Sequence, residues 1–333
     1  MKRGNSVNLT VGSYLAAIDM GSNSFHLLIA QVQGNGWRTV CTEERKVQLA
    51  AGSEVGCLQL EAQQRALLCL HDYKKVLAKY HITELHVVAT ASLRGVGNAA
   101  PFLSAVEDVL GVRPNIISGE SEAELVYLGV SAGLLLSSDK DVQKGCLVVD
   151  IGGGSTELAW GSVVQMHRGV SVDVGCLRYL RYFPNGELQQ EYFMAARDAA
   201  AKMFEHALAE FPAWGTESQC SVMGCSGTLL AVEQVLLAKT REAGKVGGGI
   251  HLHDLRALAE NVSLFSTVDE VRYQGLAEDR RSIFASGVAI VLALFEVLNI
   301  DSMQLSQRGL REGIIENRLA NGGLTFQQGG QQQ

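Results

Sequence analysis

The stretch that decides the fold is "VVDIGGGSTELAW", residues 148–160. An apolar run ends in Asp150, three glycines follow, and a second strand-like run resumes after Ser155. Small residues between two such runs are typical of a β-hairpin turn. Because glycine has no Cβ, the N–H groups of such a turn can also converge on an anion. The stretch is therefore either a plain turn or a phosphate cradle with a metal-binding carboxylate at its edge.

A second copy of this pattern lies near the start of the chain. Residues 18–29, "IDMGSNSFHLLI", align without a gap with residues 149–160. The alignment pairs Asp19 with Asp150, Gly21 with Gly152, Ser24 with Ser155 and Leu27 with Leu158. Two such hairpins, each opening one half of the chain, predict duplicated domains that face each other across a cleft. Two unrelated glycine hairpins are the alternative.

Strand-like and helical patterns alternate around these hairpins. The predicted helices lie at 60–80, 98–111, from Gly119, at 188–211 and from about Thr228, and the further predicted strands at 38–52, 84–92, 115–118, 163–170 and 220–224. This alternation predicts an α/β protein with helices packed on mostly buried sheets. The apolar run 283–295 is too short to cross a bilayer and is expected to be a helix buried against a sheet.

Composition and charge exclude several classes of protein. The chain has 333 residues, of which 47% are hydrophobic and 19% charged, as expected for a soluble globular protein of two domains. A net charge of −7 gives no general affinity for nucleic acid, so a polyanionic substrate requires a local basic lining. The seven cysteines favour free thiols in a reducing cytosol, with Cys146, Cys176 and Cys225 as small core residues.

Three turns carry the candidate phosphate-binding residues. The first two are the hairpin turns, whose serine, asparagine and threonine side chains add donors without charge. The third, "MGCSGTLL" (223–230), also follows an apolar strand and precedes a helix, whose N-terminus favours anions. The predicted set is Gly21, Ser22, Asn23, Ser24, Gly152, Gly153, Gly154, Ser155, Ser226, Gly227 and Thr228.

The aspartates at the strand ends are candidate metal ligands. Asp19 and Asp150 could hold Mg²⁺, which takes one or two carboxylates together with waters and phosphate oxygens. Glu157, on the outgoing strand, either completes that shell or is an exposed strand carboxylate. His251 and His253 have no third ligand nearby and are interpreted as a helix start.

Hydrolysis also requires a group that orients or deprotonates water, and "SGESEAELV" (118–126) offers three carboxylates for this role. They are Glu120, Glu122 and Glu124, and acids in a first helical turn often serve only the helix dipole. Arg94 ends a buried strand and either neutralises phosphate charge or forms a surface salt bridge. A further set of arginines is expected on solvated helix faces: Arg256, Arg272, Arg280 and Arg281.

Together these motifs resemble the exopolyphosphatase / guanosine pentaphosphate phosphatase family, within the sugar kinase–heat-shock protein–actin superfold. The matching blocks, in order, are "AAIDMGSNSFHLLIA", "VVATASLR", "ISGESEAELVYLGV", "LVVDIGGGSTEL", "GCSGT" and "GLREGIIE". The resemblance covers roughly residues 14–320. It implies two actin-like (ribonuclease H-like) domains with the active site between them, release of the terminal phosphate with Mg²⁺ or Mn²⁺, and a homodimer.

The resemblance also implies boundaries and roles. Domain I is expected over 14–135, with the last helix, 309–320, returning to it, domain II over 136–308, and a disordered tail over 321–333. Glu122 matches the family's catalytic glutamate, and Arg94 joins it as a cation that contacts phosphate. Asp150 and Glu157, and with them Asp19, are the expected metal residues.

This chain departs from the family pattern at two places in the core. Ser121 stands where a second glutamate is frequent, and Gln48 stands where a basic residue is common. Longer members continue into helical C-terminal domains, so the expectation here is a two-domain core that holds a phosphate tail.

The leading hypothesis is a cytoplasmic hydrolase of polyphosphate or guanosine pentaphosphate, without nucleic-acid or membrane partners. Two stretches, "VVATASLR" and "KVQLAAG", look slightly closer to the pentaphosphate phosphatase branch. The alternatives are a kinase or ATPase of the same superfold and a non-catalytic sensor of an alarmone or polyphosphate.

Overall fold

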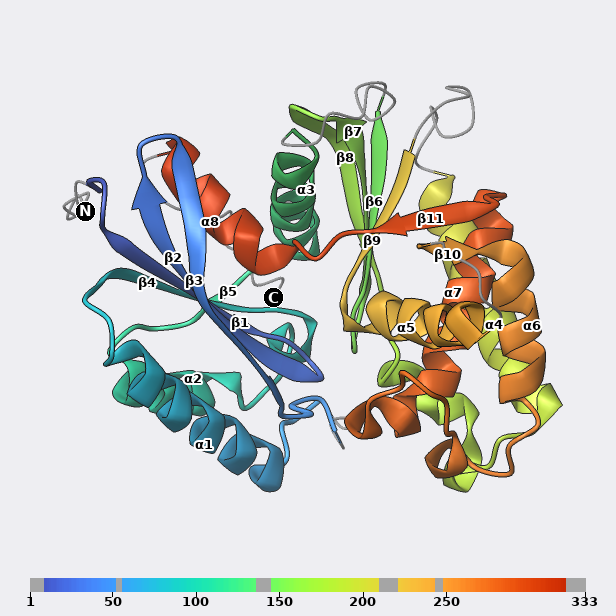
Figure 1. The fold of residues 1–333 in the computed structure, drawn as a ribbon. Helices are drawn as coiled ribbons and strands as arrows, with labels where there is room; N and C mark the ends of the chain where they lie inside the picture. Colours follow the sequence, from blue (N-terminus) through green and yellow to red (C-terminus); the bar gives the residue numbers. More distant parts are fainter. Residues whose placement is uncertain (1–8, 52–55, 136–144, 210–220, 243–247, 322–333) are drawn as a thin grey trace. The chain divides into compact units, whose positions relative to one another are not determined.

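The computed structural model describes residues 9–51, 56–135, 145–209, 221–242 and 248–321 (Figure 1). The chain divides into two units, unit 1 with Met1–Gly129 and Leu310–Gln333, and unit 2 with Val130–Gly309. Apart from Asn321, the tail predicted to be disordered lies outside the described residues.

Unit 1 is built on a five-stranded sheet of order β3-β2-β1-β4-β5. Its strands are β1 (Tyr14–Met20), β2 (Ser24–Gln33), β3 (Gly36–Lys46), β4 (Ile82–Ala89) and β5 (Asn115–Ile116). The first three pair antiparallel as a meander, whereas β4 lies parallel to both β1 and β5. The first glycine turn joins β1 to β2 and places Asp19 opposite His26, so the first predicted hairpin is confirmed.

Helices cover both faces of this sheet. Alternate residues of β1, such as Ile18 and Met20, form one core with α1 (Leu60–Leu77) and α2 (Ala99–Leu110). The last helix, α8 (Leu310–Asn321), packs on β1 and β2 from the opposite face (Figure 1). The helix α3 (Gly119–Leu135) follows β5 and continues past the boundary between the units.

A buried ion pair fastens α8 to β4. Arg318 Nε and Nη2 donate to the two carboxylate oxygens of Glu84 at 2.6 and 2.7 Å, and His86 Nε2 lies 3.2 Å from the same carboxylate. The side chains of Arg318 and Glu84 are 6% and 15% exposed. The hydrogen bonds from Arg318 hold the pKa of Glu84 below its ordinary value, and burial lowers the pKa of His86.

Replacing Arg318 by methionine should lower the free energy of unfolding by about 3 kcal/mol, because Glu84 would stay buried without its cation. The pKa of Glu84 is lower in the folded protein than in the unfolded chain. The ion pair therefore contributes fully to the free energy of unfolding above the ordinary glutamate pKa, and this contribution is lost as the pH falls through the folded pKa. Urea unfolding should therefore separate wild type and variant at pH 7 and bring them together only when the pH falls below the folded pKa of Glu84. Arg38→Met, on the exposed part of β3, is the control, and an equal loss there would refute the assignment.

Unit 2 repeats this plan on a six-stranded sheet of order β10-β11-β9-β6-β7-β8. Its strands are β6 (Cys146–Ile151), β7 (Thr156–Ser162), β8 (Gln165–Val172), β9 (Ser221–Cys225), β10 (Ile250–His251) and β11 (Ser302–Leu305). The strands β6, β7 and β8 form an antiparallel meander, and β9 lies parallel to both β6 and β11. Asp150 faces Glu157 as Asp19 faces His26, so the second hairpin and the α/β class are confirmed.

The helices of unit 2 are α4 (Gln190–Leu208), α5 (Gly227–Glu242), α6 (Leu252–Val262) and α7 (Arg281–Leu298). Short 3₁₀ segments lie at Arg178–Tyr182 (η4), Pro184–Gly186 (η5), Val268–Glu270 (η6) and Glu278–Arg280 (η7), and one at Ala91–Leu93 (η2) in unit 1. The helix α6 starts directly after His251, as predicted. Cys146, Cys176 and Cys225 are buried, as predicted for core residues.

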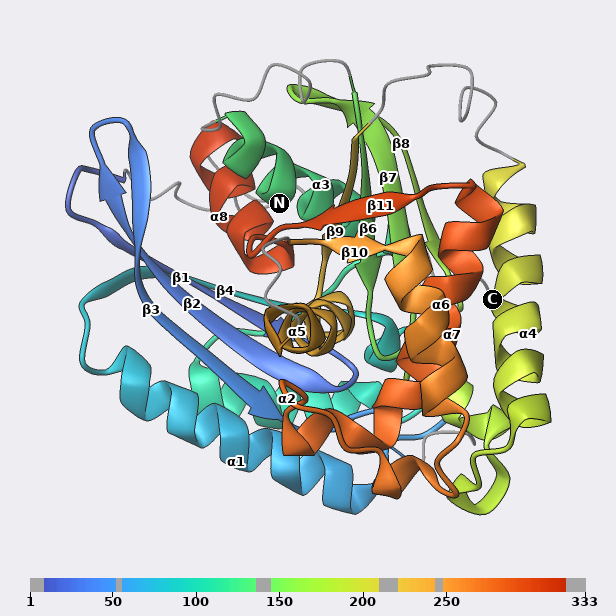
Figure 2. The same ribbon diagram turned by 45° about the vertical axis from the view of Figure 1, so that its right-hand side comes forward.

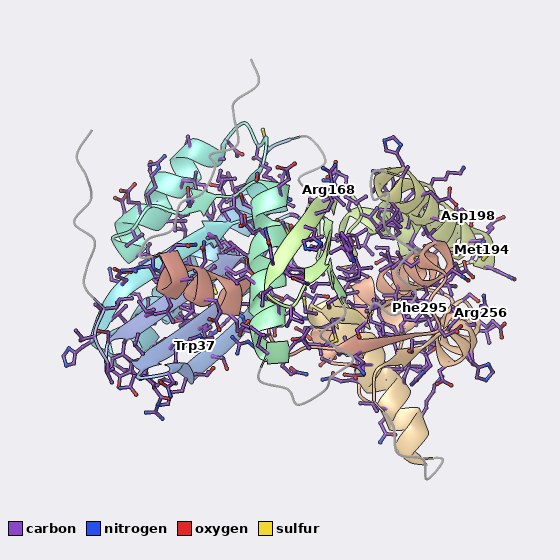
Figure 3. All side chains as sticks on the ribbon, turned by 90° about the horizontal axis from the view of Figure 1, so that it is seen from above. Trp37, Arg168, Met194, Asp198, Arg256 and Phe295 are labelled. Carbon is purple, nitrogen blue, oxygen red and sulfur yellow. The ribbon has the colours of Figure 1, made fainter. Side chains whose placement is uncertain are left out.

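The apolar run at 283–295 forms α7, the core helix of unit 2. It lies within Glu278–Leu298, which among the described residues is the one helical stretch that is long and apolar enough to span a membrane. Most of that stretch is buried inside the protein. As predicted, it shares one hydrophobic core with strands of the sheet, such as Leu147 of β6 and Leu158 of β7, and it also packs along α4 and α6 (Figure 2). Phe295 is fully buried in this layer, whereas Met194 and Asp198 lie on the outer face of α4 (Figure 3).

Candidate active site

The first glycine turn, residues 21–24, is held in place by hydrogen bonds that its carbonyl groups accept. The N–H of Gln48 donates to the carbonyl of Asn23 at 2.7 Å, and the N–H of Ala50 donates to the carbonyl of Ser22 at 3.1 Å. In a planar trans peptide the C=O and the following N–H point in opposite directions. The amides that follow these carbonyls therefore point away from residues 47–50, as an anion cradle requires. The serine and asparagine side chains of the turn are buried.

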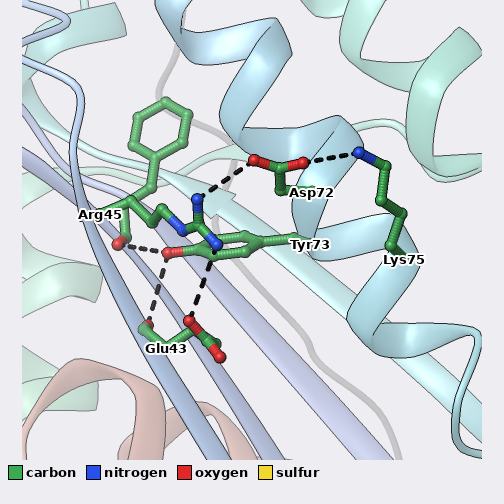
Figure 4. A network of polar contacts seen from close by, with 6 residues as sticks. Glu43, Arg45, Asp72, Tyr73 and Lys75 are labelled. Atoms are coloured by element: carbon green, nitrogen blue, oxygen red, sulfur yellow. Dashed lines mark hydrogen bonds and ion pairs between the residues drawn. The ribbon is translucent and has the colours of Figure 1, made fainter.

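Helix α1 fixes the surroundings of this turn. Tyr73 Oη donates to the carbonyl of Phe25 at 2.7 Å and approaches the carbonyl of Glu43 at 3.4 Å (Figure 4). Burial raises the pKa of the Tyr73 hydroxyl well above its ordinary value, so it remains a donor. Arg65 Nε donates to the carbonyl of Val47 at 2.9 Å. The strand that leaves the turn and the segment that holds its carbonyls are thus both fastened to α1.

The second glycine turn is held in the same way from residues 176–178. Three consecutive carbonyls accept hydrogen bonds from this segment: Gly152 from Cys176 N–H at 3.0 Å, Gly153 from the N–H groups of Leu177 and Arg178 at 2.9 and 3.1 Å, and Gly154 from Arg178 Nε at 3.1 Å. By the same peptide geometry, the amides of Gly153, Gly154 and Ser155 point to the opposite side. Each unit therefore contains a glycine turn whose carbonyls accept hydrogen bonds from a neighbouring segment, and these bonds set the direction of the N–H groups that follow.

Beside the second turn, a row of oxygen ligands crosses the sheet. Asp150 lies opposite Glu157, which lies opposite Ser171 on β8. Ser171 Oγ donates to Glu157 Oε1 at 2.7 Å. Glu157 is only 2% exposed, so the alternative of an exposed strand carboxylate is wrong. Two adjacent carboxylates are a donor set that suits Mg²⁺ or Mn²⁺.

The matching row in unit 1 has a different chemistry. Asp19 faces His26, and His26 Nδ1 lies 4.0 Å from Glu44 Oε2. The register is duplicated, but the carboxylate pair occurs only in the second hairpin. Across the described residues, no three His, Cys, Asp or Glu side chains form a metal-binding group. A cation held by Asp150 and Glu157 would therefore complete its shell with water and substrate oxygens.

Among the three acids at the start of α3, Glu122 is set apart by burial. It is 7% exposed, whereas Glu120 and Glu124 are exposed. Arg94 Nη1 donates to Glu122 Oε2 at 2.8 Å, so the predicted catalytic pair is brought together within unit 1. The helix-dipole interpretation remains adequate for the other two acids.

Ser121, at a departure from the family pattern, completes the cap of α3. Its N–H donates to Ser118 Oγ at 3.1 Å, and Ser118 Oγ donates to Ser121 Oγ at 3.0 Å. The N–H of Glu122 donates to the carbonyl of Ser118 at 2.9 Å. The loss of the second glutamate therefore leaves the helix start well capped and Glu122 firmly placed.

The third turn contains a strained residue. Ser226 has φ of 120°, in a region that non-glycine residues rarely adopt. Its Oγ accepts the N–H of Leu229 at 3.4 Å, and Thr228 Oγ1 lies 3.6 Å from Cys176 Sγ. The third turn thus contacts the segment that holds the second turn. Strain of this kind is common at sites that bind ligands.

Ser226→Gly should raise the free energy of unfolding by about 1 kcal/mol, because glycine adopts this φ without strain and is itself a fair N-cap. If the strained serine serves substrate binding, the same variant should lose affinity for inorganic tripolyphosphate. Thermal unfolding and calorimetric titration of one preparation measure both effects. A destabilised variant would show that Ser226 is not strained in the folded protein.

One arginine near the third turn was missed by the sequence prediction, which placed Arg280 on a solvated helix face. Its guanidinium group lies so close to Gly227 that an added Cβ would overlap with it. Arg280 also lines a small cavity with Thr228, Ala231 and Phe284. The signal available in the sequence was the glycine of "CSGT", but nothing local indicated which side chain would use the space.

Comparisons with known proteins place these features in context. A sequence model described as the Ppx/GppA phosphatase family matches residues 28–321. A guanosine-5'-triphosphate,3'-diphosphate pyrophosphatase of Pseudoalteromonas translucida is 35% identical over 306 residues, which are 91% of this chain and 59% of that protein. The chain thus spans about three fifths of the length of this curated relative.

Solved structures agree in fold. An exopolyphosphatase-like protein is 26% identical with a TM-score of 0.81, covering 93% of this chain and 100% of that one. An exopolyphosphatase from Cytophaga hutchinsonii is 22% identical with a TM-score of 0.80, covering 92% and 98%. A structure from Aquifex aeolicus, described as a Ppx/GppA enzyme, has a TM-score of 0.71 at 23% identity, covering 92% and 99%. These likenesses confirm the predicted actin-like α/β fold.

Proposed function

The chain belongs to the Ppx/GppA phosphatase family, and we propose that it is a phosphoanhydride hydrolase that removes the terminal phosphate of a polyanionic substrate. The substrate class is inorganic polyphosphate or the 5′-triphosphate of guanosine pentaphosphate. Both present the same terminal anhydride to the same groups, and the relatives named above carry both kinds of activity in their names.

The observation that carries the proposal is the orientation of the turn amides. In both glycine turns the carbonyls already accept hydrogen bonds on one side. The direction of the following N–H groups is therefore set before an anion binds, and they need not reorient. Preorganised amides of this kind stabilise the negative charge that develops on phosphoryl oxygens. Uncharged donors in two turns suit a chain of phosphates better than a single carboxylate.

The proposed mechanism assigns the remaining steps to the Arg94–Glu122 pair. Glu122 positions the attacking water and accepts its proton at a carboxylate oxygen, while the water oxygen bonds to the terminal phosphorus, the anhydride P–O bond breaks and the shortened phosphate chain leaves with the bridging oxygen. Arg94, now bonded to Glu122 at 2.8 Å, also donates to the terminal phosphate and neutralises part of its charge. Asp150 and Glu157 would hold Mg²⁺ or Mn²⁺, which supplies further charge neutralisation at the phosphate oxygens when bound.

The test is phosphate release by the purified chain from short polyphosphate, long polyphosphate and guanosine pentaphosphate, each with Mg²⁺ and with a chelator. Acceptor-independent release that requires the cation supports the proposal. Consumption of ATP only when an acceptor is added, with the phosphoryl group transferred to that acceptor, would instead indicate a kinase. Tight binding of all three substrates without turnover would indicate a sensor.

A further inference from the structure

We propose that Arg178 is a positioning residue for phosphate binding. Its side chain fixes the carbonyl of Gly154 and thereby orients the amide that follows in the second glycine turn. The inference rests on the proposed function, because it concerns how the same site takes up a phosphate chain. Arg178 was outside the residues predicted from the sequence.

Arg178 makes two adjacent contacts with the turn. Its backbone N–H donates to the carbonyl of Gly153 and its Nε donates to the carbonyl of Gly154, both at 3.1 Å. Its Nη2 lies 3.2 Å from the exposed carboxylate of Asp173. One residue therefore fixes two consecutive peptide units of the turn.

The hydrogen bond from the Arg178 side chain to the carbonyl of Gly154 has no counterpart made by a backbone N–H in the described residues. Backbone N–H groups hold the carbonyls of Gly152 and Gly153, whereas in the described part of the chain the carbonyl of Gly154 is held by the Arg178 side chain. Fixing this carbonyl also fixes the N–H of Ser155, because the two belong to one planar peptide. Gly175 packs so closely against the turn that an added Cβ would collide with Gly153 and Gly154.

Three consecutive glycines have more backbone freedom than any other tripeptide, so an unfastened turn would sample several amide orientations. Part of the binding free energy of a phosphate would then be spent on ordering the peptide between Gly154 and Ser155. Arg178 removes that cost before the substrate arrives. Its effect should therefore appear in phosphate affinity and in the order of the turn, while the fold persists.

Arg181 offers a matched control on the same short helix. It lies one 3₁₀ turn after Arg178, is exposed, and places its guanidinium 5.2 Å from the ring centre of Tyr182 and 5.6 Å from that of Tyr179. Arg181→Met removes the same charge as Arg178→Met without touching the carbonyl of Gly154. Arg178→Lys keeps the charge but loses the planar Nε donor.

The experiment titrates inorganic tripolyphosphate, with divalent cations chelated so that no turnover occurs, into the full chain and its variants by calorimetry, and follows the amide signals of ¹⁵N-serine-labelled protein. For Arg178→Met we expect the dissociation constant to rise by about tenfold, because the cost of ordering one flexible peptide unit is then taken from the binding free energy. The amide signal of Ser155 should broaden in the free Arg178→Met variant and sharpen on binding, because its peptide is the one that loses the side-chain hydrogen bond. Arg178→Lys should fall between wild type and Arg178→Met, and Arg181→Met should match wild type.

If Arg178→Met and Arg181→Met weakened tripolyphosphate binding equally, the proposal would be overturned, because the loss of one positive charge would explain both results. Unchanged affinity in both Arg178 variants would also overturn it. Because binding is measured without turnover, these results stand apart from the proposed hydrolysis. A wild-type chain that binds tripolyphosphate but releases no phosphate from any substrate would refute the function and leave the role of Arg178 in binding intact.

Discussion

Glu122→Gln lowers kcat by about a thousandfold in our expectation, with KM little changed, because the variant keeps the shape of the side chain but can no longer accept a proton from water. Glu122 is 7% exposed and bonded to Arg94 at 2.8 Å, so its position is set before the substrate binds. The amide oxygen of glutamine can still accept from Arg94, which should preserve the fold. Steady-state kinetics on tripolyphosphate and on guanosine pentaphosphate measure the effect.

Glu120→Gln is the matched control, because it removes the same charge from the same helix at an exposed position. It should retain activity close to wild type. If kcat of Glu122→Gln stayed within about tenfold of wild type, Glu122 would not be the group that activates water. An equal loss of kcat in Glu120→Gln would show that the negative charge at the start of α3, and not the position of Glu122, accounts for the effect.

The second large effect is expected from Asp150→Asn, which should lower kcat/KM by about a thousandfold at ordinary Mg²⁺ concentrations through the loss of one cation ligand. Binding of Mn²⁺, followed by electron paramagnetic resonance, should weaken in parallel. Binding of tripolyphosphate should change in opposite directions with and without the cation. Without it, the variant should bind more tightly than wild type, because one negative charge facing a polyanion has been removed.

That reversal of sign separates a cation ligand from a merely structural aspartate. With Mg²⁺ present, the variant should bind tripolyphosphate more weakly than wild type, since the bridging charge is lost. Asp198→Asn, an exposed aspartate on the outer face of α4, is the control and should show neither effect. Weaker binding by Asp150→Asn under both conditions would mean that Asp150 supports the turn and does not hold the cation.

The two hairpins could be predicted from sequence because their signals are local. An apolar run, an aspartate and a small-residue turn specify the strand pairing, and the gapless repeat between 18–29 and 149–160 predicts a shared register. The structure confirms that register, with Asp19 opposite His26 and Asp150 opposite Glu157. Element ends were less predictable: helix α1 ends at Leu77 although the sequence prediction ran to residue 80, and Ala78 keeps helical φ and ψ beyond that end.

The choice among the three acids of α3 was also available in the sequence. Residues four apart share a helix face, so Glu120 and Glu124 lie together, whereas Glu122 lies about 200° from each. Ala123, Leu125 and Val126 mark the buried side of the helix near Glu122. Helical phase alone therefore favours Glu122 as the acid that is drawn inside.

The residues that support the turns could not have been found in this way. Arg178 and Arg280 act on glycines distant in sequence, and an arginine in a short irregular segment carries no periodic signal. The φ of 120° at Ser226 is equally invisible, because serine gives no indication of a conformation that it seldom adopts. These features depend on how β6, β9 and the segments beside them pack.

The central claim is that water attacks the terminal phosphate, and the most direct measurement is the oxygen content of the product. Turnover of tripolyphosphate in H₂¹⁸O, analysed by mass spectrometry, should give inorganic phosphate with a single solvent oxygen and a chain shorter by one phosphate. This should occur without any added acceptor and should fall with Glu122→Gln. Phosphate free of ¹⁸O, or product formed only in the presence of an acceptor, would contradict hydrolysis at this site.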